Sequence, residues 1–209
     1  MKSNTFYPLF INLHGKKILV VGGGRVATRK CLNFLSFGPQ ITVVAPEICE
    51  ELQKIEQISL VFREACISDI QPEIYLVVLA TDDPVAQEQL SEECRKKGVL
   101  FNRSDLPEMS DFITGSIINK EPILASVISS GSPEVTKLVS RKLEDVISPE
   151  LVQLSVVMNE FRRTVIEKYP DRKIREEFFK KWSSEEILER ISVEGIERVR
   201  EEIQKCLSQ

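Results

Sequence analysis

The chain has 209 residues, 42% of them hydrophobic and 29% charged, with a formal net charge of −4 at pH 7. That length suits one domain with an extension or two small domains. The negative charge argues against a nucleic-acid partner held by bulk electrostatics. No segment is apolar over the length of a membrane span, and the first residues lack a signal-peptide pattern, so we expect a cytoplasmic protein without a membrane partner.

The cysteines and the single histidine give no sign of a metal site. The five cysteines form no CxxC pair and are odd in number, which argues against both a disulfide framework and a zinc site. His14 stands beside Gly15 in a predicted turn, where a surface residue is a better interpretation than a catalyst or a ligand. We therefore predict no resident metal ion.

The chain is organised around a buried strand that runs into three glycines. Residues 18–21 are apolar without alternation, as in a strand covered on both faces, and apolar residues at helical spacing follow the glycines. Strand, glycine turn and helix in this order predict a dinucleotide-binding motif, Gly22-x-Gly24-x-x-Ala27. In such a motif Gly22 permits the turn, Gly24 admits the pyrophosphate and Ala27 lets the helix pack on the strand. The alternative is a flexible turn without a ligand.

Further strands and helices alternate along the first half of the chain. Apolar runs predict an edge strand at residues 7–13 and several inner strands, and amphipathic spacing predicts two more helices. We expect strands at 41–45, 59–63, 75–80 and 99–102, and helices at 47–58 and 84–97. This alternation is typical of an α/β fold with a Rossmann-like, doubly wound parallel sheet, in which ligands bind beyond the carboxyl ends of the strands.

Polar residues that follow these strands are the candidate ligands of the dinucleotide. No basic residue follows the second strand, and Glu47 lies near the position of a ribose-binding carboxylate, so we expect NAD rather than NADP. The alternative place for Glu47 is the first turn of the next helix. Asp82 and Asp83 are predicted first as caps of the helix that opens at Pro84, and Thr81 and Asp82 would then also line the cofactor.

The second half of the chain changes to a hairpin and then to helices. Residues 112–118 and 123–129 are two β-rich runs, and Ser132 is a natural N-cap for a helix that ends near Ile147. A hairpin alone buries too little apolar surface to be stable, so we expect it to pair with a second copy or with another chain, and a homodimer is the natural inference. We divide the chain into a dinucleotide-binding domain (1–110), a β-rich dimerisation segment (111–148) and a helical C-terminal domain (149–209).

With these elements in place, the chain resembles the precorrin-2 dehydrogenase and sirohydrochlorin ferrochelatase family of siroheme biosynthesis. The resemblance covers about the first 145 residues, and the aromatic cluster of the helical tail is similar to the family's last domain. No single motif is specific for the family, but the combination of the motifs in this order and spacing is specific. They are Tyr7-Pro8-Leu9-Phe10, Val20-Val21-Gly22-Gly23-Gly24-Arg25-Val26-Ala27 with Arg29-Lys30, Thr42-Val43-Val44-Ala45-Pro46, Ala80-Thr81-Asp82-Asp83, Asn102 to Pro107, Phe112, and Ser129-Ser130-Gly131-Ser132-Pro133.

The resemblance implies NAD-dependent oxidation of precorrin-2, a tetrapyrrole with many carboxylates, to sirohydrochlorin, and in some members insertion of ferrous iron. It implies that Asp105 is the catalytic base, which accepts a proton while hydride leaves the macrocycle. A turn aspartate is an equally good interpretation from the residues alone. By family position, the cofactor-binding residues also include those of the pyrophosphate side, the adenosine ribose and the fifth strand, namely Arg25, Val26, Pro46, Glu47 and Asn102.

Two departures from the family concern the substrate. Arg103 and Ser104 replace two small apolar residues, and Arg103 would add a cation for a substrate carboxylate. The loop at 130–133 is a residue or two shorter than usual, and Ser132 is predicted as an N-cap, with a substrate contact or a modification site as the alternative. Lys137 and Arg141, one turn apart on the next helix, are candidates for other substrate carboxylates, with a solvated helix face as the alternative.

Two questions of function stay open at this point. Iron insertion would depend on Asp105 and on the nitrogens of the macrocycle, because the residues offer no evident iron site. An NAD-sensing dimeric module without catalysis would use the same glycine motif, but it leaves the motif from Asn102 to Pro107 unexplained.

Overall fold

The protein divides into two compact units. The computed structural model describes residues 6–129 and 132–209. The first unit ends at Thr114 and the second begins at Gly115. The three-part division at residues 110 and 148 stays a prediction.

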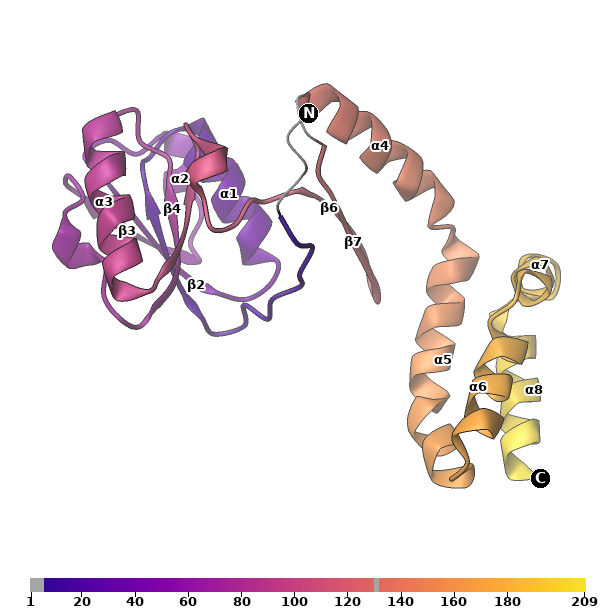
Figure 1. The fold of residues 1–209 in the computed structure, drawn as a ribbon. Coiled ribbons are helices and arrows are strands. Elements are labelled where there is room, and N and C mark those ends of the chain that lie inside the picture. The colour runs from indigo at the N-terminus through magenta and orange to yellow at the C-terminus, as the bar shows by residue number, and fades with distance from the viewer. Residues whose placement is uncertain (1–5, 130–131) are drawn as a thin grey trace. The chain divides into compact units, whose positions relative to one another are not determined.

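The first unit is built on a five-stranded parallel sheet (Figure 1). The strand order is β3-β2-β1-β4-β5, so that β1 pairs with β2 on one side and with β4 on the other. The chain therefore changes direction across the sheet between β1 and β4, which is the point where such sheets bind ligands. The strands are β1 (Lys17–Val21), β2 (Gln40–Ala45), β3 (Ile58–Phe62), β4 (Ile74–Leu79) and β5 (Leu100–Arg103).

Helices cover both faces of this sheet, which explains the unbroken apolar run of β1. Ile18 and Val20 pack with α1 (Arg25–Leu35) in one buried cluster, whereas Leu19 and Val21 pack with α3 (Pro84–Lys97) in another. Successive side chains of a strand point to opposite faces, so both sets are buried. The remaining elements of the unit are α2 (Glu50–Gln53) and two 3₁₀ turns at Ile67–Asp69 and Pro107–Met109. The predicted α/β fold with a Rossmann-like sheet is confirmed.

Three predicted elements differ from the structure. Residues 7–13 form no strand, and Tyr7 and Phe10 are 85% and 65% exposed, because no strand lies beside them to accept their hydrogen bonds. Helix α2 is shorter than predicted, since the amide of Cys49 donates to the carbonyl of Gly23 (2.9 Å) and keeps the preceding residues in a loop. The hairpin begins at Ser116 rather than Phe112, whose carbonyl accepts a hydrogen bond from Asn102.

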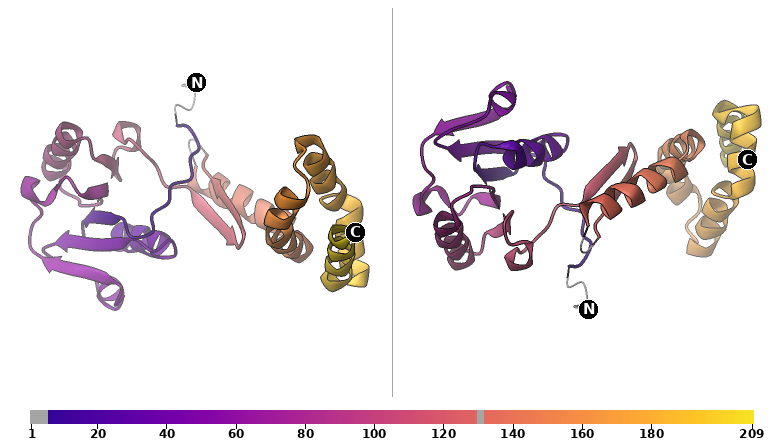
Figure 2. Two further views of the ribbon diagram at one scale, coloured as in Figure 1. Left: turned by 90° about the horizontal axis from the view of Figure 1, so that it is seen from below. Right: turned by 90° about the horizontal axis from the view of Figure 1, so that it is seen from above.

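The second unit combines a hairpin with helices (Figure 2). Strands β6 (Ser116–Lys120) and β7 (Ile123–Val127) pair antiparallel, and α4 (Pro133–Val146) packs on them. The ammonium group of Lys120 donates to the carbonyls of Glu144 (2.6 Å) and Ile147 (2.9 Å), so the hairpin caps the carboxyl end of α4.

The four last helices form a bundle with a core of its own. They are α5 (Pro149–Lys168), α6 (Arg172–Trp182), α7 (Glu185–Glu194) and α8 (Ile196–Ser208). The core includes Trp182 and Phe178, whose ring centroids are 6.3 Å apart, so the predicted helical C-terminal region with its aromatic cluster is confirmed. Across residues 6–129 and 132–209, no helix has the length and apolar content needed to cross a membrane.

A buried lysine connects α1 with the end of the first unit. Lys30 is only 8% exposed, and its ammonium group donates a hydrogen bond to the hydroxyl of Thr114. Among the residues that the structure describes, no carboxylate pairs with this ammonium group. Burial, with a smaller contribution from the charge of Arg29, lowers the pKa of Lys30 to about 8.

We expect replacement of Lys30 by methionine to change the pH dependence of stability. In the folded chain the amine loses its proton around its lowered pKa of about 8, whereas in the unfolded chain it does so near pH 10.4. The folded state therefore releases the proton first, and the wild type should gain about 1 kcal/mol of unfolding free energy relative to Lys30→Met between pH 7 and 9.

Urea unfolding at the two pH values measures this difference. Lys54→Met is the control, because the side chain of Lys54 is 77% exposed. A difference between wild type and Lys30→Met that does not move with pH would contradict the prediction.

Candidate dinucleotide and catalytic site

The glycine turn after β1 is fixed by close backbone contacts. Gly22 has a φ of +118°, and a Cβ atom there would lie 2.2 Å from the carbonyl oxygen of Ala80, at the end of β4. A Cβ atom on Gly23 would lie 2.0 Å from the carbonyl oxygen of Glu47, which follows β2. Both positions therefore need glycine, and the turn is packed between the ends of β2 and β4.

Gly24 differs from its two neighbours because it faces open space. It is the N-cap of α1 with a φ of −93°, and a Cβ atom there would meet no atom within 4 Å. Arg25 and Val26, which follow it in the first turn of α1, are exposed, and no acidic residue lies in that turn. An uncovered helix N-terminus beside a glycine fits a pyrophosphate, since its amide groups can donate to phosphate oxygens.

Glu47 lies in the loop after β2 and not in a helix. Helix α2 begins at Glu50 with Cys49 as its N-cap, so the alternative of a place in its first turn is excluded. Pro46 and Glu47 are exposed, and no hydrogen bond or ion pair joins the carboxylate of Glu47 to the described residues. The carboxylate is thus available to a ribose hydroxyl group.

The two aspartates in the loop after β4, both predicted as helix caps, have different roles in the structure. Asp83 caps α3, because its Oδ1 atom accepts hydrogen bonds from the amides of Val85 (2.8 Å) and Ala86 (3.1 Å). Asp82 does not cap the helix and is exposed. The carbonyl of Thr81 accepts a hydrogen bond from the side chain of Gln87 (2.7 Å).

Three buried polar atoms of the first unit without partners in the described structure belong to residues near the ends of β4 and β5. Asn102 is 3% exposed, and its Nδ2 atom donates to the carbonyl of Phe112 (3.0 Å), but its Oδ1 atom has no partner in the described structure. The buried Oγ atom of Ser104 and Oε1 atom of Gln87 also have none. Buried polar groups are normally hydrogen-bonded, so these atoms fit a ligand or ordered water at this edge of the sheet.

Asp105 is paired with Arg103 at the end of β5. The Nε atom of Arg103 donates to Oδ1 (3.1 Å) and its Nη2 atom to Oδ2 (2.9 Å), and its Nη1 atom binds the carboxylate of Glu88 on α3. The side chain of Arg103 is 3% exposed and that of Asp105 is 33% exposed. The hydrogen bonds from Arg103 hold the pKa of Asp105 below its usual range.

This geometry bears on two of the predicted roles. Asp105 is ionised and within reach of solvent, as a base requires, although it is also part of a turn. Arg103 has protein carboxylates for partners, so binding a substrate carboxylate would require those pairs to open, and that role stays a prediction. Glu88, Gln87 and Ser110, whose hydroxyl accepts from the Arg103 amide (2.8 Å), were not predicted, since no sequence spacing links α3 with the end of β5.

The other predicted substrate residues lie in the second unit. Ser132 is the N-cap of α4, but its side chain makes no capping hydrogen bond, and its carbonyl accepts from the hydroxyl of Ser129 (3.0 Å). Lys137 pairs with Glu134 (2.9 Å), and Arg141 is exposed. Residues 130–131 of the loop that was predicted to be short lie outside the described residues.

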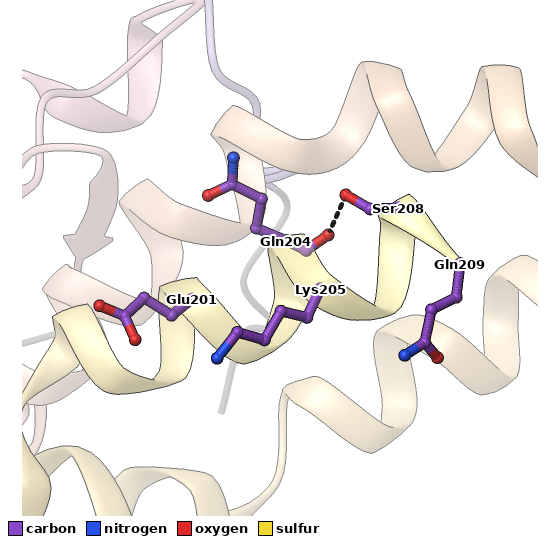
Figure 3. A pocket seen from close by; sticks show the side chains of 5 residues that line it. All are labelled: Glu201, Gln204, Lys205, Ser208 and Gln209. Atoms are coloured by element: carbon purple, nitrogen blue, oxygen red, sulfur yellow. Dashed lines mark hydrogen bonds between the residues drawn. The ribbon is translucent and has the colours of Figure 1, made fainter.

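No other feature of the described chain has the composition of an active site. The described residues contain no group of three or more His, Cys, Asp or Glu side chains that could hold a metal ion. A shallow hollow of the second unit is lined by residues of the end of α8 alone, with a hydrogen bond from the hydroxyl of Ser208 to the carbonyl of Gln204 (2.9 Å) (Figure 3). Its side chains point apart and form no convergent set of donors.

Comparison with known proteins identifies the family. A family described as putative NAD(P)-binding matches residues 9–116, which is more than half of the chain and contains the glycine turn, Glu47 and Asp105. The chain belongs to this NAD(P)-binding family. The predicted class of cofactor is thereby confirmed.

Relatives of this NAD(P)-binding protein include longer enzymes. The siroheme synthase of Nitrosococcus oceani is 33% identical over 189 residues, which are 89% of this chain and 40% of the relative. The siroheme synthase of Photorhabdus laumondii is 34% identical over 179 residues, which are 83% of this chain and 38% of the relative. The chain thus spans about two fifths of the length of these relatives.

A solved structure shares the fold of this NAD(P)-binding protein. The structure named SirC, precorrin-2 dehydrogenase, has a TM-score of 0.75 and covers 96% of this chain and 100% of its own. Its sequence identity is 21%, so the likeness supports the fold. The siroheme synthase relatives, together with the fold of SirC, confirm the predicted resemblance.

We expect Gly24→Ala to fold normally and to lose the dinucleotide. A φ of −93° suits alanine and its methyl group meets nothing in the protein, but it would occupy the space in which the backbone approaches a pyrophosphate. The Kd for NAD should rise roughly tenfold or more, which corresponds to a loss of at least about 1.4 kcal/mol.

Gly22→Ala is the contrasting variant and should mainly lower the melting temperature, because its Cβ atom meets the Ala80 carbonyl. Isothermal titration calorimetry measures the binding, and differential scanning calorimetry measures the melting temperature. Gly24→Ala that binds NAD like the wild type would contradict the proposed place of the pyrophosphate.

Proposed function

We propose that this protein oxidises precorrin-2 to sirohydrochlorin with NAD as the hydride acceptor, a step of siroheme biosynthesis. The observation that carries the proposal is the position of Asp105, the residue assigned as catalytic by the resemblance. It is ionised at the carboxyl end of β5, in the same sheet edge as the open glycine turn. The names of the siroheme synthase relatives and of SirC support the same reaction class.

The residues of the first unit have separable roles in this proposal. The amides at Gly24 and the first turn of α1 bind the pyrophosphate, and the carboxylate of Glu47 accepts a hydrogen bond from the adenosine ribose, which favours NAD over NADP. Thr81, Asp82 and the free oxygen of Asn102 line the site farther along the edge. The bound nicotinamide supplies an acceptor for hydride from the macrocycle.

Asp105 accepts the proton that the macrocycle loses as hydride leaves it. The carboxylate is ionised at neutral pH and can take up a proton, and the two hydrogen bonds from Arg103 fix its orientation. Its 33% exposed side chain is within reach of a substrate outside the sheet edge. Ser132, Lys137 and Arg141 of the second unit are proposed to contact the peripheral carboxylates of the tetrapyrrole.

The visible absorbance of precorrin-2 with NAD under anaerobic conditions tests the reaction. We expect sirohydrochlorin to form with the wild type and the rate to fall about 100-fold or more in Asp105→Ala, the usual range for loss of a general base. Glu92→Gln is the control, because Glu92 is exposed on α3 and makes no ion pair among the described residues. NADP in place of NAD, with wild type and Glu47→Gln, tests the coenzyme preference.

The outcomes separate the proposal from its rivals. A wild type that binds NAD but never changes fresh precorrin-2 would overturn the enzymatic function and favour an NAD-sensing module. Iron insertion is a prediction of the resemblance alone, and ferrous iron added after the NAD-dependent step tests it. A further spectral shift above the metal-only background would support it.

We also propose that a second copy covers the apolar face of the hairpin and α4. Partly exposed apolar side chains line both elements, namely Ile117, Leu124, Ile128, Val135, Leu138, Val139, Leu143 and Val146. Val135, Leu138, Val139, Leu143 and Val146 have the spacing of one helix face, and an apolar helix face left uncovered in the monomer favours burial against a partner.

Leu138→Glu should therefore shift the protein from dimer to monomer, because a carboxylate would be buried in the interface without a partner. Leu138 is 51% exposed in the single chain, so the variant should fold. Analytical ultracentrifugation measures the mass, with Glu144→Gln on the charged side of α4 as the control. A monomeric wild type, or a variant as dimeric as the wild type, would contradict the proposal.

A further inference from the structure

The buried guanidinium group of Arg103 is used entirely inside the protein. Two of its nitrogens bind both oxygens of Asp105 side by side, and a third binds Glu88 from α3. Arg103 is 3% exposed, whereas its partners Asp105 and Glu88 are 33% and 49% exposed. The cation thus lies beneath two carboxylates that reach the surface.

Stability alone gives a weak reason for this arrangement. A buried ion pair loses much hydration free energy, and an apolar residue of similar volume is often as stable. The resemblance places a small apolar residue at this position, so the fold does not require a charge there. A planar guanidinium group that binds a carboxylate through two hydrogen bonds does, however, fix the orientation of that carboxylate.

We infer that Arg103 is a positioning residue that orients the Asp105 carboxylate for the reaction, and that Glu88 holds Arg103 in place from α3. This inference rests on the proposed function of Asp105. Asp105 follows the end of β5 in a turn, where its side chain would otherwise adopt several rotamers. With Arg103 in place, one orientation is fixed before the substrate binds, which lowers the entropy cost of reaching the reactive geometry.

Arg103 is the main influence of the surrounding groups on the pKa of Asp105, first through its hydrogen bonds and then through its positive charge. Arg95 lies 3.7 Å from Glu88 and stacks on the ring of Phe101, and Asp111 accepts a hydrogen bond from the Phe101 amide (3.2 Å). Of these groups only the two arginines are cations, and Arg103 contacts Asp105 directly. Removal of Arg103 would take away the hydrogen bonds and the positive charge that lower the pKa of Asp105, so the proton affinity of this carboxylate would rise.

Three variants test the inference, namely Arg103→Met, Arg103→Lys and Glu88→Gln, with Glu92→Gln as the control. In Arg103→Met we expect kcat to fall about tenfold or more, as for a misplaced catalytic group, with the KM for NAD unchanged. The acid limb of the pH profile of kcat/KM should move to higher pH. Arg103→Lys should restore part of the rate, and Glu88→Gln, which keeps the Arg103–Asp105 pair, should show a smaller loss.

A titration of Asp105 by carboxyl ¹³C NMR makes the test independent of turnover. The resonance of Asp105 should titrate at higher pH in Arg103→Met than in the wild type. If the wild type has no activity on precorrin-2, the proposed function fails, and this titration still shows whether Arg103 controls the carboxylate. Wild-type kcat and an unshifted acid limb in Arg103→Met would overturn the inference, and a faster Arg103→Met would show that the pair restrains Asp105 instead.

Discussion

The structure depends on the absence of a side chain between Gly22 and the carbonyl group of Ala80. A Cβ atom there would lie 2.2 Å from the oxygen, and the φ of +118° is one that other residues rarely adopt. This contact lets the chain leave β1 directly beside β4, at the point where the strand order reverses. Gly23 makes the same close approach to Glu47, so the ends of β1, β2 and β4 form one edge. The proposed cofactor residues Gly24, Glu47 and Asp82 lie in the loops that leave these three strand ends, and Asn102 lies on β5, which pairs with β4.

The second constraint is electrostatic and lies at the far strand of the same edge. Arg103 lowers the pKa of Asp105 and orients its carboxylate, and the cost of burying the guanidinium group is offset by three hydrogen bonds to two carboxylates. A base must be unprotonated before it acts, and a fixed orientation favours transfer from one direction. The glycine turn thus permits close packing of the strand ends, whereas the ion pair orients a charged side chain.

The sequence predicted the parts of this site that local patterns determine. Apolar runs located the parallel strands, and the glycines located the turn, because both depend on neighbouring residues. The prediction of a strand at residues 7–13 was wrong, because a strand needs a neighbouring strand to pair with and the local sequence pattern does not show whether one is present. The burial of Lys30 and the pairing of Arg103 with Glu88 were missed because they join residues 84 and 15 positions apart. Contacts of that kind are set by the fold and leave no periodic signal.

The cations predicted for substrate carboxylates differ in how they are paired within the protein. Among the residues predicted for substrate carboxylates, Arg103 belongs to the first unit, but its guanidinium group is committed to Asp105 and Glu88. Arg141 of the second unit is exposed, and Lys137 has a single partner, Glu134, in an exposed ion pair. Such surface pairs contribute little free energy and exchange readily for another carboxylate. Under the proposed function, the first unit would therefore supply dinucleotide binding and proton transfer, while Lys137 and Arg141 of α4 remain the predicted cations whose charge is available to a polyanionic tetrapyrrole.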